Sequence, residues 1–241
     1  MDDLLSELNS IKDESITLEL DIGAINGLKK MPVDIFDGVY LSEAHNNALI
    51  LCIDVRNFSD FFCSQTDDNV FMLIKEFTLN LLSCINHFGY GCSYYKFLGD
   101  GVLVIWDKIN EDAINEALDI FYTYSDFANE DLFKPYKGLG LGGALVEEKV
   151  FKYEISAELS QLKYRDYIGY GINLACRLQS LAGVNELILN NRIATTRSLP
   201  FRVDESPEKL KELHLFKGLL EDDRKRALYY DRKTSNSSIS I

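Results

Sequence analysis

Hydrophobic residues, in continuous runs or at helical spacing, divide the middle of this chain into predicted strands and helices. The continuous apolar run at 48–53 is typical of a buried strand. Residues 67–88 carry apolar side chains at helical spacing, and Gly89 follows as a helix stop. Residues 91–97 and 102–106 flank a short glycine-containing turn, which predicts two strands joined as a hairpin.

The second half of the chain continues this mixed pattern. Residues 110–129 have the apolar spacing of another long helix. The glycine-rich segment 138–146 lacks the GxGxxG spacing of a nucleotide-binding loop, so we predict a strand that lets a neighbouring group approach closely. The pattern then predicts a helix at 171–182 and strands at 186–190, 212–217 and 226–230. This order predicts an α+β domain, an antiparallel-rich sheet with helices on one face.

The two ends of the chain differ from this patterned middle. Residues 1–45 are polar and acidic, with a short amphipathic stretch near Leu4 and Ile11, and we predict an N-terminal leader there. Residues 232–241 are rich in serine and are predicted to be disordered. Residues 46–231 are therefore predicted to form the functional domain.

Composition excludes some partners. A net charge of −13 argues against nucleic acid or an anionic membrane surface as the main partner. No apolar run approaches the roughly 20 residues that span a bilayer, and the acidic N-terminus lacks the layout of a signal peptide. The five cysteines show no CxxC spacing and are predicted to be buried free thiols in a reducing compartment. We therefore expect a cytoplasmic protein.

Two aspartates in specific settings are the strongest chemical signal. Asp54 follows the apolar strand directly, and Asp100 lies in the turn between the two hairpin strands. Carboxylates brought together at strand ends are hard oxygen ligands for a pair of divalent cations. Such cations assist phosphoryl chemistry on a nucleotide.

A later segment adds a third polar cluster. Asp166 lies just before a predicted helix that carries Asn173 and Arg177. Residues four apart on a helix share a face, so these two side chains can reach one ligand. The forked guanidinium suits a phosphate, and the neutral amide suits a ribose.

Together these blocks resemble the catalytic domain of the class III nucleotide cyclases, over about residues 46–231. The resemblance implies a ferredoxin-like cyclase domain that converts a nucleoside triphosphate into a 3′,5′-cyclic nucleotide and pyrophosphate. It also implies two divalent metal ions per site, Mg²⁺ or Mn²⁺, as cofactors. In that family the active sites are shared between two chains, so the expected assembly is a head-to-tail homodimer.

The resemblance implies a role for each residue that matches a family motif. Asp54 and Asp100 match the metal-binding aspartates, and the Val55 carbonyl is expected to add a ligand. Lys96 and Asp166 match the two residues that read the base.

The ribose and the phosphates have their own matches. Asn173 matches the residue that orients the ribose, and Arg177 matches the arginine that stabilises the α-phosphate in the transition state. Lys217 falls where the family places a lysine for the triphosphate. The backbone of Asn57 and Phe58 is expected to hold phosphates, although the family usually has glycine at the first position. Asparagine tolerates positive φ, so we expect that turn to be kept.

The identity of the base follows less directly. Lys96 can donate to a ring nitrogen and Asp166 can accept from an exocyclic amine, an edge that adenine and cytosine both present. A lone cyclase domain also resembles the stand-alone pyrimidine cyclases of bacterial antiphage signalling systems. ATP is therefore slightly favoured, with CTP or UTP close behind. A different class of function is an inactive regulator that binds nucleotide, although the chain keeps every residue of the motif.

Overall fold

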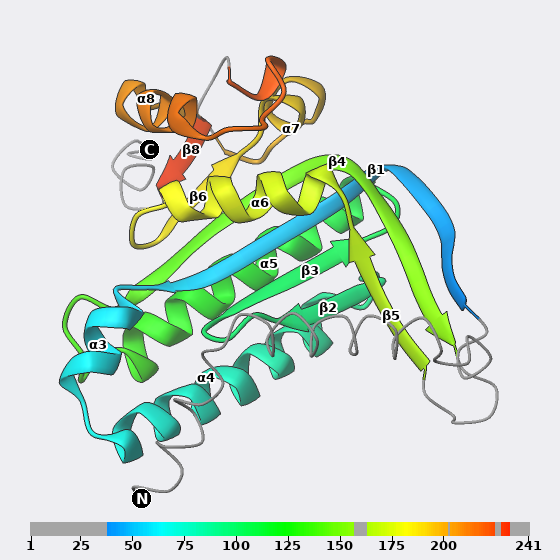
Figure 1. Cartoon of the computed structure of the whole chain (residues 1–241). Helices are drawn as coiled ribbons and strands as arrows, with labels where there is room; N and C mark the ends of the chain where they lie inside the picture. Colours follow the sequence, from blue (N-terminus) through cyan, green and yellow to red (C-terminus); the bar gives the residue numbers. More distant parts are fainter. Residues whose placement is uncertain (1–37, 157–162, 202, 225–227, 232–241) are drawn as a thin grey trace, which may run out of the picture. The chain divides into compact units, whose positions relative to one another are not determined.

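The structure, a computed structural model, describes residues 38–156, 163–201, 203–224 and 228–231 (Figure 1). The predicted tail, and all of the predicted leader before residue 38, lie outside the described residues. The described residues fall into a main unit, 41–152 and 166–231, and a small unit that includes 153–156 and 163–165. In the small unit, Arg165 Nε donates to Glu154 Oε1 at 2.6 Å.

Eight strands form the sheet, in the order β2-β3-β1-β4-β6-β8-β7, with β5 paired to β4. β1 with β3, β2 with β3, β6 with β8 and β7 with β8 pair antiparallel, whereas β4 and β6 pair in parallel, so the predicted antiparallel-rich sheet is confirmed. The predicted hairpin is also confirmed, because β2 and β3 pair across the predicted turn. The strands are β1 (Gly38–Arg56), β2 (Tyr94–Phe97), β3 (Gly101–Trp106), β4 (Gly140–Ser156), β5 (Lys163–Ile168), β6 (Glu186–Leu189), β7 (Asp204–Glu205) and β8 (Leu228–Asp231).

The central strand β1 is buried on both faces, which explains its continuous apolar run. Successive side chains of a strand point to opposite faces. Leu49 and Leu51 pack into the core under α4 (Asp67–Phe88) and α5 (Glu111–Phe127), two helices that contact each other. Ile50 packs into a second core that contains buried residues of α6 (Tyr170–Leu181). The two long helices thus lie on one face as predicted, and α6 adds a layer on the other (Figure 1).

Local signals set the ends of the two long helices. Thr66 caps α4 by accepting from the Asn69 N–H at 3.4 Å, and Gly89 ends it, as predicted. Asn110 caps α5 by accepting from the Ala113 N–H at 2.8 Å. The remaining short helical segments before the last helix are α3 (Phe58–Ser64), η2 (Ala128–Leu132) and α7 (Asn191–Thr196). Across the described ranges, no helix is both long enough and apolar enough to cross a bilayer.

The predicted strand at 212–217 is wrong, because that region belongs largely to the helix α8 (Pro207–Leu215). Ser206 caps this helix by accepting from the Lys209 N–H at 3.3 Å, and Pro207 occupies its first turn, where a missing N–H costs nothing. The short alternation of apolar residues was therefore outweighed by a helix-start signal before it. A single turn, η3 (Asp222–Arg224), follows, and β8 then overlaps the predicted strand at 226–230.

Two further expectations need correction. β1 begins at Gly38, inside the segment 1–45 predicted as a leader, because the strand extends well before its apolar run. All five cysteines are free, as predicted, but they are not all buried. Cys63 is exposed because α3 turns a neighbouring residue, Phe61, towards the core instead.

Candidate active site

Asp54 and Asp100 are brought together by the pairing of β1 with β3. Asp54 lies opposite Gly101 in the antiparallel register, and the Val55 N–H donates to the Asp100 carbonyl at 3.2 Å. A Cβ atom at Gly101 would lie 3.1 Å from Asp54 Oδ1, so only glycine leaves this carboxylate its space. The turn that carries Asp100 also needs Gly99, whose φ is +75°.

The electrostatics of this pair favour a bound cation. Burial raises the pKa of Asp100 above its ordinary value, and the negative charge of Asp54 raises it further. The side chain of Asp54 is 29% exposed, so the carboxylate remains accessible from solvent. Two neighbouring carboxylates that partly lose hydration repel each other, and a divalent cation offsets that repulsion.

The residues present fit a hard divalent ion. Among the described residues, no cluster of three or more His, Cys, Asp or Glu side chains could hold a metal ion. The candidate ligands are therefore two carboxylates and the Val55 carbonyl, which leave positions for water and phosphate oxygens. Magnesium is usually bound in this way, through one or two carboxylates and the phosphates of a substrate.

We expect Asp100→Asn to stabilise the metal-free fold. The pKa of the Asp100 carboxyl is raised on folding. Its contribution to the stability of the fold is therefore fully present at a pH below the ordinary pKa of 3.8, and it is lost as the pH rises through the raised pKa. The amide removes that loss, so the variant should melt higher than wild type near neutral pH, and the gain should narrow as pH falls. Thermal melts of both proteins in a chelator, at several pH values, measure this. A lower melting temperature for the variant at neutral pH would contradict it.

Two residues that sequence reasoning missed hold Asp54 in place. The guanidinium of Arg56 and the Nε2 of Gln179, at 3.0 Å, both donate to Asp54 Oδ2. Gly142 on β4 makes room for the Arg56 side chain, because a Cβ atom at Gly142 would lie 2.9 Å from Arg56 Cδ. The two-residue spacing of Asp54 and Arg56 on one strand was a weak signal for the pair. Nothing local marked Gln179, which lies 125 residues away in sequence.

Lys96 and Asp166, the predicted base-reading pair, are in direct contact. Lys96 Nζ donates to Asp166 Oδ2 at 2.5 Å, and Asp166 Oδ1 accepts from the Tyr94 hydroxyl and the Tyr167 N–H, each at 2.8 Å. The Asp166 side chain is 9% exposed, whereas that of Lys96 is 39% exposed. The carboxylate is therefore buried, and the lysine lies on its solvent-facing side.

Asn173 and Arg177 lie on α6, one turn apart, as their spacing predicted. The helix begins after Gly169, whose φ of +141° strains any other residue. A Cβ atom there would also lie 3.2 Å from the Lys149 carbonyl. Asn173 is exposed and Arg177 is half-buried, so both side chains can reach a ligand in solvent.

Lys217 reaches this helix through its backbone. The guanidinium of Arg177 donates to the Lys217 carbonyl. The Tyr170 hydroxyl accepts from the Leu220 N–H at 2.8 Å and donates to Asp223 Oδ2 at 2.7 Å. These contacts dock the 216–220 loop on α6 and leave the Lys217 side chain exposed. The sequence motifs did not identify Tyr170 as a residue that holds this loop.

The predicted phosphate turn has the expected backbone conformation. Asn57 has φ +62° and ψ +20°, the left-handed region that asparagine tolerates. Its Nδ2 donates to the Gly138 carbonyl at 2.6 Å. A cavity of about 640 Å³ opens beside this turn, lined in part by Tyr136 and Lys137. The Phe58 side chain packs against the core, so this residue can offer a ligand only its backbone.

Solved structures of nucleotide cyclases match this fold. The adenylyl cyclase CyaB from P. aeruginosa is 15% identical with a TM-score of 0.57, over 78% of this chain and 94% of that chain. The catalytic core of a rhodopsin-guanylyl cyclase with converted specificity, in complex with ATPalphaS, is 11% identical with a TM-score of 0.59. The match covers 80% of this chain and 97% of that chain. The guanylate cyclase domain of RhGC from Catenaria anguillulae, in complex with GTP, is 13% identical with a TM-score of 0.53. The match covers 78% of this chain and 97% of that chain.

The comparisons agree on the class of fold. No family model matches the chain, and no curated protein matches it. The solved structures nevertheless cover most of this chain and nearly all of their own chains. The chain therefore has the fold of the class III adenylyl and guanylyl cyclase catalytic domains, which is the fold that its motifs implied.

Proposed function

We propose that this protein is a class III nucleotide cyclase. It converts a nucleoside triphosphate into a 3′,5′-cyclic nucleotide and pyrophosphate. The observation that carries the proposal is the apposition of Asp54 and Asp100 at the ends of paired strands, within a cyclase fold. In the reaction the ribose 3′-oxygen forms a bond to the α-phosphorus, the bond to pyrophosphate breaks, and the hydroxyl proton is released.

Asp54 and Asp100, with the Val55 carbonyl, would hold two divalent ions, Mg²⁺ or Mn²⁺. When bound, such ions lower the pKa of a hydroxyl and neutralise phosphate charge. Arg56 and Gln179 hold one oxygen of Asp54, which orients the other towards Gly101 and the Asp100 turn. The strand pairing and these two donors therefore preorganise the site before the substrate binds.

The α6 side chains complete the reaction centre. Arg177 offers a guanidinium to the charge that grows on the α-phosphate in the transition state. Its contact with the Lys217 carbonyl supports the proposal that Lys217 binds the same triphosphate. Asn173, one turn earlier and exposed, orients the ribose so that its 3′-oxygen faces the α-phosphorus.

The active site is proposed to be shared between two chains in a head-to-tail homodimer. One chain carries both the metal aspartates and the base, ribose and phosphate residues, so a two-fold dimer would contain two equivalent sites. Asn173 is exposed and Lys96 is 39% exposed, which leaves both available to a substrate held partly by another chain. The guanylyl cyclase domain of the RhoGC fusion protein from Blastocladiella emersonii has been solved both as a non-canonical dimer and as a monomer, so the similar folds do not select the assembly.

The base-reading pair favours a base with an exocyclic amine. Similar folds have been solved with ATPalphaS and with GTP, so the fold alone does not select the base. Asp166 accepts hydrogen bonds from the Tyr94 hydroxyl, the Lys96 ammonium and the Tyr167 N–H, so its carboxyl group acts as an acceptor at this position. It would accept from the amine of adenine or cytosine and repel the carbonyl oxygen of guanine or uracil. ATP is slightly favoured, and a pyrimidine cyclase of an antiphage system is the alternative.

Pyrophosphate release with four separate triphosphates and Mn²⁺ tests the proposal. We expect ATP or CTP to be turned over about tenfold faster than GTP and UTP, because an unmatched buried polar group costs about 1–3 kcal/mol. Mass spectrometry of the product should show the cyclic nucleotide. Release from none of the four, with nucleotide binding intact, would instead identify an inactive nucleotide-binding regulator.

A further inference from the structure

Tyr94 makes a contact that the base-reading motif does not include. Its hydroxyl donates to Asp166 Oδ1 at 2.8 Å, and the Tyr167 N–H donates to the same oxygen at 2.8 Å. A carboxylate oxygen has about two lone-pair positions, so these two donors occupy Oδ1. The other oxygen, Oδ2, contacts Lys96, whose side chain is 39% exposed. Oδ2 is therefore the oxygen of Asp166 that lies on the side of the partly exposed lysine.

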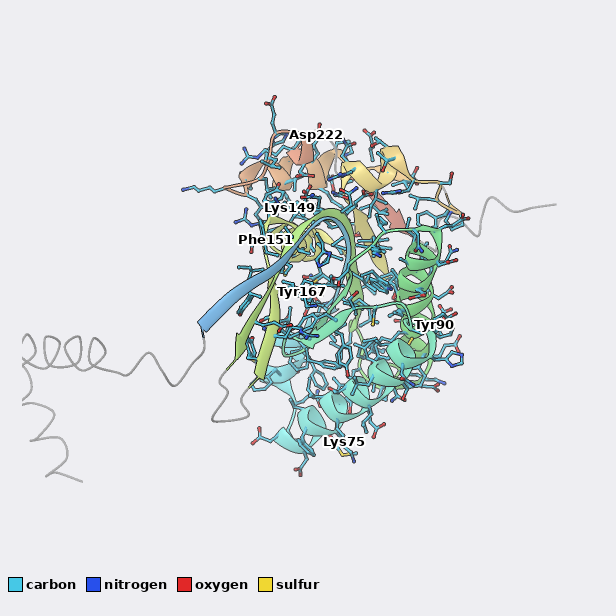
Figure 2. The ribbon with its side chains drawn as sticks, turned by 90° about the vertical axis from the view of Figure 1, so that its right-hand side faces the viewer. Lys75, Tyr90, Lys149, Phe151, Tyr167 and Asp222 are labelled. Atoms are coloured by element: carbon cyan, nitrogen blue, oxygen red, sulfur yellow. The ribbon has the colours of Figure 1, made fainter. Side chains whose placement is uncertain are left out.

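The Tyr94 hydroxyl is held rigidly. Tyr94 lies on β2 opposite Ile105 of β3, two residues before Lys96 and so on the same face of the strand. Its ring packs against that of Tyr167, with 5.0 Å between centroids, and Figure 2 labels Tyr167 near the centre of the view. The Tyr167 hydroxyl in turn donates to Asp107 at 2.7 Å. Packing and hydrogen bonds thus determine where the Tyr94 oxygen lies.

We propose that Tyr94 determines base specificity by holding the Asp166 carboxylate in the orientation that accepts an exocyclic amine. The inference rests on the proposed function, because it names the base class of the same site. With Oδ1 held from behind, the carboxylate cannot rotate away from a base that presents a carbonyl oxygen instead. Adenine or cytosine gains a hydrogen bond, and guanine or uracil meets repulsion that the carboxylate cannot relieve.

Removal of the hydroxyl should therefore reduce discrimination without removing the binding site. In Tyr94→Phe the ring remains packed on Tyr167, but Asp166 loses one of the donors that orient it. Hydrogen bonds to charged groups are among the stronger ones in proteins. We expect the preference for an amine-bearing base to fall about tenfold, because that is the size of the contribution that one hydrogen bond from the amine to Asp166 would make.

The test measures binding, so that it does not depend on turnover. The ligands are the 3′-deoxy forms of ATP and of purine riboside triphosphate, which lacks only the exocyclic amine, with Mn²⁺ and the full chain. A second pair is 3′-deoxy CTP and its counterpart without the 4-amino group. Calorimetry gives the ratio of the two dissociation constants within each pair. Tyr95→Phe is the matched control, because Tyr95 is the next residue on β2 and is 47% exposed.

The expected result is a smaller ratio in Tyr94→Phe, through weaker binding of the amine-bearing ligand, and an unchanged ratio in Tyr95→Phe. An unchanged ratio in Tyr94→Phe would overturn the inference. An equal loss of affinity for both ligands of a pair would also overturn it, because a purely structural role produces that result. So would a wild-type protein that binds both ligands of each pair with the same affinity. Failure of the proposed function has a different signature, normal binding without pyrophosphate release.

Discussion

Asp54→Asn and Asp100→Asn should each reduce turnover by about a thousandfold or more, because each removes a charged ligand from a metal-assisted phosphoryl transfer. Each amide has nearly the volume of the carboxylate it replaces, so the pairing of β1 with β3 should persist. Pyrophosphate release at saturating Mn²⁺ and triphosphate measures the effect. Asp68→Asn is the control, because Asp68 is an exposed acid in the first turn of α4, and it should retain wild-type turnover.

The melting experiment separates loss of chemistry from loss of fold. Asp100→Asn is expected to be more stable than wild type without metal, so an inactive and more stable variant is the signature of a functional carboxylate. Such a trade between stability and function is common where like charges are held together at a site. If both variants keep near-normal turnover, the two aspartates do not bind the catalytic metal ions.

Mixing two inactive variants should restore activity. Asp54→Asn damages the metal half of the proposed shared site, and Arg177→Ala damages the phosphate half. In a mixed dimer one site collects both defects, and the other receives an intact half from each chain. Random exchange makes about half of the dimers mixed, each with one working site of two, so activity should recover to roughly a quarter of wild type. Pyrophosphate release before and after mixing measures the recovery.

A second mixture is the control for this experiment. Asp54→Asn and Asp100→Asn damage the same half of the site, so their mixed dimers contain no intact metal half and should stay inactive. Mass spectrometry of chains with different isotope labels shows whether the subunits exchange. If the first mixture stays inactive although the chains exchange, each site lies within one chain and the shared-site dimer is wrong.

The local parts of this fold could be predicted because their signals are local. The bounds of α4 follow from a cap, an apolar periodicity and a glycine within one segment, and the hairpin follows from its turn. The site motifs were readable for a related reason, since Asn173 and Arg177 need only a helix to share a face. The region 212–217 was mispredicted where a weak alternation competed with a capping residue six positions earlier.

The amino-acid sequence by itself determined the central strand, the hairpin and the long helices, together with the cyclase motifs and the candidate residues for metal, base and phosphate. The tertiary structure alone decided which partners hold those residues. Gln179 reaches Asp54 from 125 residues away, and Tyr94 reaches Asp166 from 72 residues away. Such contacts have no local periodicity, because they depend on which strands pair and on how α6 packs across the sheet, and only the folded chain brings these side chains together.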